Sequence, residues 1–111
     1  MNATRRDEFR PFAIDVHPRR DFVRVAPVGE IDLATVGPLR ERIGELLSAG
    51  FSRLTLDLQG VTFMDSLGLG TLVVGHRICG DMGVRFTVRN PSSFVAHLLT
   101  VSGFGERLLE S

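Results

Sequence analysis

Alternating apolar and polar residues predict two strands near the start of the chain. Phe12, Ile14 and Val16 alternate with smaller or more polar neighbours, and residues 22–28 form a second segment of this kind. The five residues between them, 17–21, suit the turn of a hairpin. The chain therefore begins with two antiparallel strands.

Apolar residues at helical spacing predict three helices, at about residues 36–49, 66–79 and 92–102. Thr35 is the expected N-cap of the first helix because Pro38 is tolerated only close to a helix start. Residues 29–34 would then be an exposed connection. The last helix is expected to bury four apolar residues, namely Phe94, Val95, Leu98 and Val101.

Further strands are predicted at residues 54–58 and 84–88, with a loop at 61–65 and a short terminal strand at 104–109. The element order is β-β-α-β-α-β-α-β. Strands that alternate with helices are normally parallel and joined by right-handed crossovers, and the opening hairpin makes the sheet mixed. The predicted fold class is α/β, with one mixed sheet and helices packed on it.

Composition fits one small domain. The chain has 111 residues, of which residues 1–11 are expected to be a flexible segment and 12–111 the domain. Thirteen basic residues balance thirteen acidic ones, so the composition gives no electrostatic indication of nucleic-acid or membrane binding. One cysteine, no signal peptide and no apolar stretch of membrane-spanning length favour a cytoplasmic protein.

The segment of residues 63–70, which joins a strand to the N-terminus of a helix, carries the most chemical information. Asp65 and Ser66 are both good N-caps, which is a purely structural reading. The glycines that follow, at 68, 70, 75 and 80, each cost a helix about 1 kcal/mol relative to alanine. Either another element packs close to this helix, or the backbone of a partner approaches its first turn.

A phosphoryl group on Ser66 would lie at the positive end of the helix dipole, close to free N–H groups. It would also add roughly −1.5 to −2 charges beside Asp65, which would repel a partner surface matched to the neutral hydroxyl. Ser66 is therefore suited to a reversible binding switch.

Three catalytic alternatives fit the sequence poorly. Val73 stands where a dinucleotide fingerprint needs its third glycine, and Met64 stands where a nucleophile elbow or a Gly-Asp-Ser-Leu esterase motif needs glycine. The three histidines have no metal-ligand spacing.

A second segment, Gly29-Glu30-Ile31-Asp32, is either a simple strand exit or an acidic ledge beside a helix start.

At these two segments the chain resembles the STAS family, and within it the bacterial anti-sigma factor antagonists. The resemblance covers about residues 12–109. It rests on Gly29-Glu30-Ile31-Asp32, on residues 54–58 leading to Phe63-Met64-Asp65-Ser66-Leu67-Gly68-Leu69-Gly70, and on Ser102-Gly103-Phe104.

The resemblance implies a partner-switching protein that is not an enzyme and needs no cofactor or metal. Its unmodified form would bind an anti-sigma factor of the histidine-kinase-like ATPase type, which releases the sigma factor. That anti-sigma factor, a serine kinase, would phosphorylate Ser66, and a metal-dependent serine phosphatase would reverse the modification. The protein would be a monomer or weak dimer, with no direct contact to nucleic acid or membrane.

Residue by residue, the resemblance makes Ser66 the phosphoacceptor and Asp65 its orienting neighbour. Gly68 would permit close approach of the partner, and the remaining partner-binding residues would be Gly29, Glu30, Ile31, Asp32 and Leu67. A second hypothesis keeps the fold without the switch: a STAS subunit or scaffold module that binds a transporter ATPase or another partner.

Overall fold

The computed structural model describes residues 12–108. The predicted flexible segment at residues 1–11 lies outside this range, as do the last three residues of the predicted domain. Within it, no helix combines the length and the apolar composition that crossing a membrane requires.

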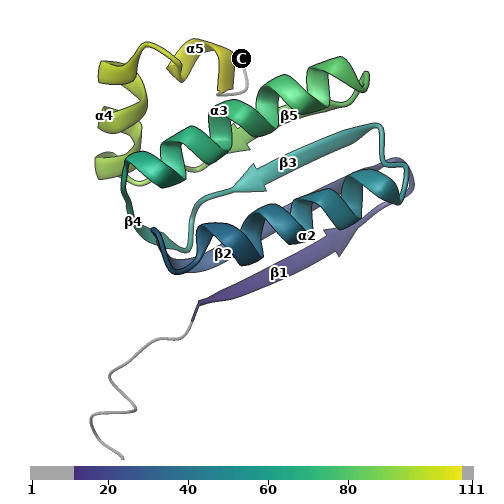
Figure 1. Ribbon diagram of the computed structural model, residues 1–111, viewed down its shortest axis with the longest axis horizontal. Coiled ribbons are helices and arrows are strands. Elements are labelled where there is room, and N and C mark those ends of the chain that lie inside the picture. Colours follow the sequence, from purple (N-terminus) through teal and green to yellow (C-terminus); the bar gives the residue numbers. More distant parts are fainter. Residues whose placement is uncertain (1–11, 109–111) are drawn as a thin grey trace, which may run out of the picture.

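The strands form one mixed sheet, as the sequence pattern predicts, and this sheet has five strands (Figure 1). Its main path runs β1-β2-β3-β5, and β4 pairs with β2 away from this path. β1 and β2 are antiparallel, whereas β2, β3 and β5 are parallel. The strands are β1 (Ala13–Pro18), β2 (Phe22–Ile31), β3 (Arg53–Asp57), β4 (Val61–Met64) and β5 (Arg85–Arg89).

Four helices complete the described chain: α2 (Val36–Ser48), α3 (Ser66–Asp81), α4 (Ser93–Ser102) and α5 (Gly105–Leu108). In Figure 1, α2 and α3 lie side by side over the same face of the sheet. All four helices contribute to one core cluster with the inward-facing residues of the strands. The sheet thus has one covered face.

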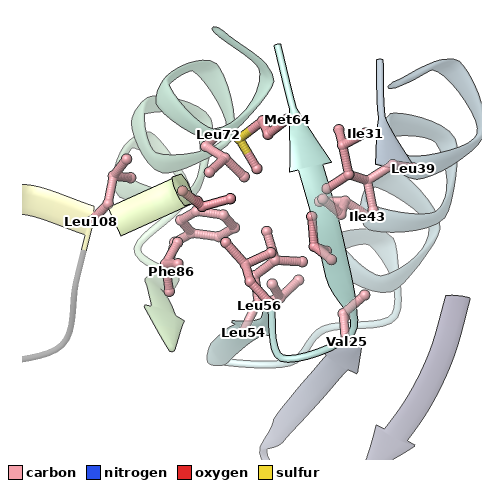
Figure 2. Packing of buried hydrophobic residues seen from close by; sticks show 14 of the residues in the cluster. Val25, Ile31, Leu39, Ile43, Leu54, Leu56, Met64, Leu72, Phe86 and Leu108 are labelled. Carbon is pink, nitrogen blue, oxygen red and sulfur yellow. The ribbon is translucent and has the colours of Figure 1, made fainter. Parts of the chain in front are cut away.

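The core consists of aliphatic side chains from β2 and β3, Phe86 of β5 and the inner sides of the helices (Figure 2). Along β2 every second residue is buried, and Leu54 and Leu56 of β3 continue this alternation, which is the pattern expected when only one face of a sheet is packed. Asp57, at the end of β3, is buried as well. Cys79 of α3 is fully buried in this core, and burial raises the pKa of its thiol to about 11.

Two predicted elements are wrong. Residues 61–64 are the strand β4 rather than a loop, and residues 105–108 form the helical turn α5 rather than part of a terminal strand. Moreover, β2 continues to Ile31, so residues 29–31 belong to the sheet and not to an exposed connection. These errors share a cause, because each of the three segments is too short to show a clear period.

The buried side of α4 also differs from the prediction. Val95 and Leu99 are fully buried, whereas Phe94 is 51% exposed and Val101 is 64% exposed. Residues four apart lie on the same side of a helix, so Val95 and Leu99 form its inner side. The apolar residues on the outer side made the sequence pattern ambiguous.

Candidate functional site

Ser66 is the first residue of α3 and is exposed. The N-cap is Asp65, whose Oδ1 accepts a hydrogen bond from the backbone N–H of Gly68 at 3.0 Å. Because Asp65 caps the helix, the hydroxyl of Ser66 is not needed for that purpose. The site therefore presents a serine at a helix N-terminus, where an added anion is favoured by the helix dipole.

Strand β4 brings together the two segments that the sequence analysis singled out. Its last residues pair in parallel with the end of β2, Phe63 with Glu30 and Met64 with Ile31. One residue later, the N–H of Asp65 donates to the carbonyl of Ile31 at 3.2 Å. The N-cap of α3 is thus hydrogen-bonded to the last residue of β2, just before the β2–α2 loop.

The β2–α2 loop is ordered by its own polar groups. Asp32 Oδ1 accepts from the N–H of Ala34 at 2.9 Å. Thr35 Oγ1 accepts from the N–H of Asp32 at 2.9 Å and donates to the carbonyl of Glu30 at 2.8 Å. Thr35 is the N-cap residue of α2, as predicted, but its hydroxyl stabilises the loop instead of capping the helix.

Glu30 is exposed and Asp32 is half-buried, so both acids reach solvent. Gly29 precedes them at an irregularity in the β2–β4 pairing and has a positive φ of 114°. Residues with a Cβ atom rarely adopt this backbone conformation, so the fold itself favours glycine at position 29.

Gly68 and Ile31 lie beneath the site. Gly68 is buried, and a Cβ atom there would lie 2.5 Å from Met64 Cγ and 2.9 Å from Ile31 Cγ2. Close packing within the chain is therefore a sufficient reason for glycine at this position, which is the first of the two alternatives that the sequence leaves open. Ile31 is fully buried in the same contact, as Figure 2 shows, so its side chain offers no surface.

Large apolar side chains are exposed on the segments that carry the site. Leu67 is 48% exposed, and Leu33, two residues beyond the carbonyl that holds Asp65, is 77% exposed. On the other side of β4, Phe63 stacks on Phe94 with ring centroids 5.5 Å apart. The sequence pattern assigned Phe94 to the core, whereas the structure exposes half of it. Leu33 and Phe63 fell in predicted connections, and no surface role was predicted for them.

The remaining candidate residues do not assemble into a second site. His17, His76 and His97 lie on β1, α3 and α4, and between residues 12 and 108 no group of acidic, histidine and cysteine side chains could hold a metal ion. A groove of about 330 Å³ lies between β1 and α2, and its lining includes no residue of the segments described above.

Comparisons with known proteins agree with this geometry. The family described as "Mlab, STAS domain" matches residues 13–110. The chain is 30% identical over 90 residues to the anti-sigma-B factor antagonist of Bacillus subtilis, covering 81% of this chain and 82% of that protein.

Solved structures with the same fold include the anti-sigma factor antagonist SpoIIAA. Its unphosphorylated form is 25% identical, with a TM-score of 0.76 over 89% of this chain and 88% of that one. The phosphorylated form of SpoIIAA from Bacillus is 23% identical, with a TM-score of 0.71 over 89% of this chain and 91% of that one. Proteins of this kind are regulatory binding proteins and not enzymes. The family match, the relative in Bacillus subtilis and the shared fold agree, and the chain belongs to the STAS domain family, among the anti-sigma factor antagonists.

Proposed function

We propose that the unphosphorylated protein binds an anti-sigma factor serine kinase of the histidine-kinase-like ATPase type and so releases a sigma factor. Phosphorylation of Ser66 switches this binding off, and a metal-dependent serine phosphatase restores it. This function belongs in the bacterial cytoplasm, where transcription takes place.

One observation carries the proposal: Ser66 is an exposed first residue of α3 whose helix is already capped by Asp65. Its hydroxyl is available to another protein's nucleotide site. In the modification, Ser66 Oγ attacks the γ-phosphorus of ATP, the bond to the ADP oxygen breaks, and the hydroxyl proton passes to a base of the kinase. SpoIIAA, which shares this fold, is known in both phosphorylated and unphosphorylated forms.

The surroundings of Ser66 explain why one anion would be enough to break a complex. Exposed Leu33 and Leu67 favour a partner surface that is apolar around the hydroxyl. A dianionic group there would have to be desolvated next to leucine side chains and beside the Asp65 carboxylate. The cost of desolvation and the repulsion by Asp65 therefore oppose binding only after phosphorylation.

Incubation with an anti-sigma factor kinase of the same organism and ATP should place one phosphate on Ser66, located by mass spectrometry. Ser66→Asp should weaken binding of the kinase at least about tenfold, because a fixed negative charge mimics part of the modification. Ser66→Ala should bind but remain unmodified.

Ser93 provides a matched control. It is the exposed first residue of α4, directly after the N-cap Ser92, and so occupies in α4 the position that Ser66 occupies in α3. Ser93→Asp should leave kinase binding unchanged. Phosphate on Ser93, or unchanged affinity of Ser66→Asp, would contradict the switch and favour the scaffold module bound to a transporter ATPase or another partner.

A further inference from the structure

Strand β1 forms one edge of the sheet (Figure 1). Among the residues that the structure describes, it pairs with β2 alone. An edge strand presents a row of backbone N–H and C=O groups to which another strand can be added. β1 therefore offers its outer side to a further strand.

The hairpin determines which backbone groups of β1 point outward. The N–H of Arg19 donates to the carbonyl of Phe22 at 2.8 Å, and hydrogen-bonded pairs alternate with non-bonded pairs along antiparallel strands. The odd-numbered residues of β1 therefore bond to β2, whereas the N–H groups of Ile14 and Val16 point to the open edge. Pro18 has no N–H, but it is the last residue of β1 and closes only the end of this edge. The carbonyl of Pro18 accepts from Arg19 Nη1 at 3.0 Å and retains a second lone pair.

The sequence of β1 is complementary to itself in antiparallel orientation. When two copies pair about a two-fold axis at Val16, the two valines lie opposite each other and Ile14 lies opposite Pro18 on the inner side of the sheet. On the outer side, Asp15 of each copy lies opposite His17 of the other. These residues form a non-hydrogen-bonded pair, in which side chains approach most closely. A carboxylate opposite an imidazole N–H donor is a favourable cross-strand pair, and the symmetry forms it twice.

Charge selects this register over the neighbouring ones. A symmetric pairing must be centred on a residue if the inner side of β1 is to remain on the inner side of the extended sheet. Centring on Asp15 would place two carboxylates directly opposite each other, which is destabilising. Centring on His17 would oppose two imidazoles and use only the outward N–H of Val16. Centring on Val16 uses both outward N–H groups of each copy.

An acidic groove lies beside this edge. It runs between β1 and α2, and the charged residues of its lining are Glu41, Arg42 and Glu45. Arg42 Nη1 lies 3.0 Å from Glu45 Oε1, so these two charges offset each other. Glu41 therefore gives the groove a net negative charge.

The register centred on Val16 brings a basic turn of the second copy to this groove. It places Arg19 of the second copy opposite Ala13, which lines the groove. Arg19 and Arg20 are exposed, and Asp21 in the same turn offsets one of them and leaves a net positive charge. The turn and the groove therefore carry opposite charges, which favours this alignment.

We infer that the open edge of β1 binds β1 of a second copy of this chain, so that two sheets join into one across a symmetric dimer. The strand and the groove include none of residues 29–35 and 63–70. Each copy therefore keeps Ser66 available, and the inference does not depend on the proposed switch.

NMR and sedimentation equilibrium of the wild-type protein between about 10 μM and about 1 mM test this inference. Sedimentation should detect a dimer, and the amides of Ile14 and Val16 should become protected from hydrogen exchange as it forms. The amides of Asp15 and His17, which bond to β2 in each copy, should be protected at every concentration. Protection of Ile14 and Val16 at every concentration would show that the edge is covered within one chain and would overturn the inference. A protein that stays monomeric at about 1 mM, or a dimer that leaves these two amides unprotected, would overturn it as well.

Exchange of the two paired side chains tests the register. His17→Asp should weaken the dimer at least about tenfold, because two carboxylates then face each other twice. Asp15→His should weaken it by less, and Asp15→His/His17→Asp should recover at least half of the wild-type affinity, because each acid again faces an imidazole. Arg24, which lies opposite His17 on β2, is present beside Asp at position 17 in the single and the double variant and so does not explain a recovery. A double variant that dimerises no better than His17→Asp would overturn the inference.

Asp81→His is a control with the same change of net charge as Asp15→His, since Asp81 is exposed on α3 and lies outside β1. It should change the affinity of the dimer by less than about twofold. A loss equal to that of Asp15→His would show that only net charge matters and would contradict strand pairing.

Discussion

At the scale of single residues, the glycines of α3 divide into two kinds. A Cβ atom on Gly68 would overlap Met64 and Ile31, whereas a Cβ atom on Gly70 would meet nothing within 4 Å. Both residues lie in the same helix, two positions apart. The first is required by close packing of α3 on β2 and β4. Nothing in the packing of residues 12–108 requires the second.

Replacing each glycine by alanine should therefore have opposite effects. Gly68→Ala should lower the free energy of unfolding by about 1–3 kcal/mol, because Met64 and Ile31 must shift. Gly70→Ala should raise it by about 0.5–1 kcal/mol, because alanine favours the helix and meets no obstacle. Urea denaturation of both variants measures the difference, and equal changes in the two would contradict the packing argument.

At this scale the sequence predicted the positions of Asp65 and Ser66 well, since capping depends on neighbours along the chain. The reason for Gly68 could not be predicted, because it lies in contact with Ile31, which is 37 residues earlier. The same applies to the exposure of Phe94, which its helical spacing assigned to the core. Only the three-dimensional arrangement distinguishes an apolar residue of the core from one at a surface.

At the scale of elements, long periodic segments were predicted and short ones were not. The hairpin of β1 and β2 and the helices α2, α3 and α4 are confirmed. β4 has only four residues and pairs with the end of β2 outside the main strand order. Four residues are too few to show a clear alternation, so the sequence did not predict this strand. α5 is a single turn of four residues.

The short ladder of β4, four residues paired with one neighbour, should make it open more readily than β3. β3 is paired on both sides, with β2 and β5, whereas β4 is paired with β2 alone. Backbone amides of β4 should exchange with solvent at least about tenfold faster than those of β3, because local opening of β4 leaves the main ladder intact. Hydrogen exchange followed by NMR tests this, and equal protection of the two strands would show that they open together.

At the scale of the whole molecule, Asp57 connects three parts of the fold. Its carboxylate accepts from Arg24 of β2, from the side-chain amide of Asn90 after β5, and from the N–H of Gln59. Burial raises the pKa of Asp57, but these hydrogen bonds and the charge of Arg24 outweigh burial and hold the pKa below its ordinary value of 3.8. The ionised carboxylate thus stabilises the folded state.

This cluster should make stability depend on pH in the acidic range. The contribution of Asp57 is complete above about pH 3.8 and is lost as the pH falls through the lowered pKa of the folded state. Asp57→Asn should reduce the free energy of unfolding by about 1.5–3 kcal/mol at neutral pH. The difference from wild type should shrink in acid, as measured by urea denaturation between about pH 7 and pH 2.5.

Asp15→Asn serves as the control, since this side chain is exposed on β1. It should change stability by less than about 0.5 kcal/mol. If the gap between wild type and Asp57→Asn stayed constant down to the lowest pH, the ionised form of Asp57 would not be the stabilising one.

The buried thiol of Cys79 has a practical consequence for following this protein. It is the sole cysteine of the sequence, and it is both inaccessible and poorly ionised in the folded chain. Alkylating reagents can therefore reach it only when the core opens. Any ligand that binds the native state alone lowers the population of open molecules and slows this labelling. The chain thus carries a native reporter of complex formation that requires neither a tag nor a dye.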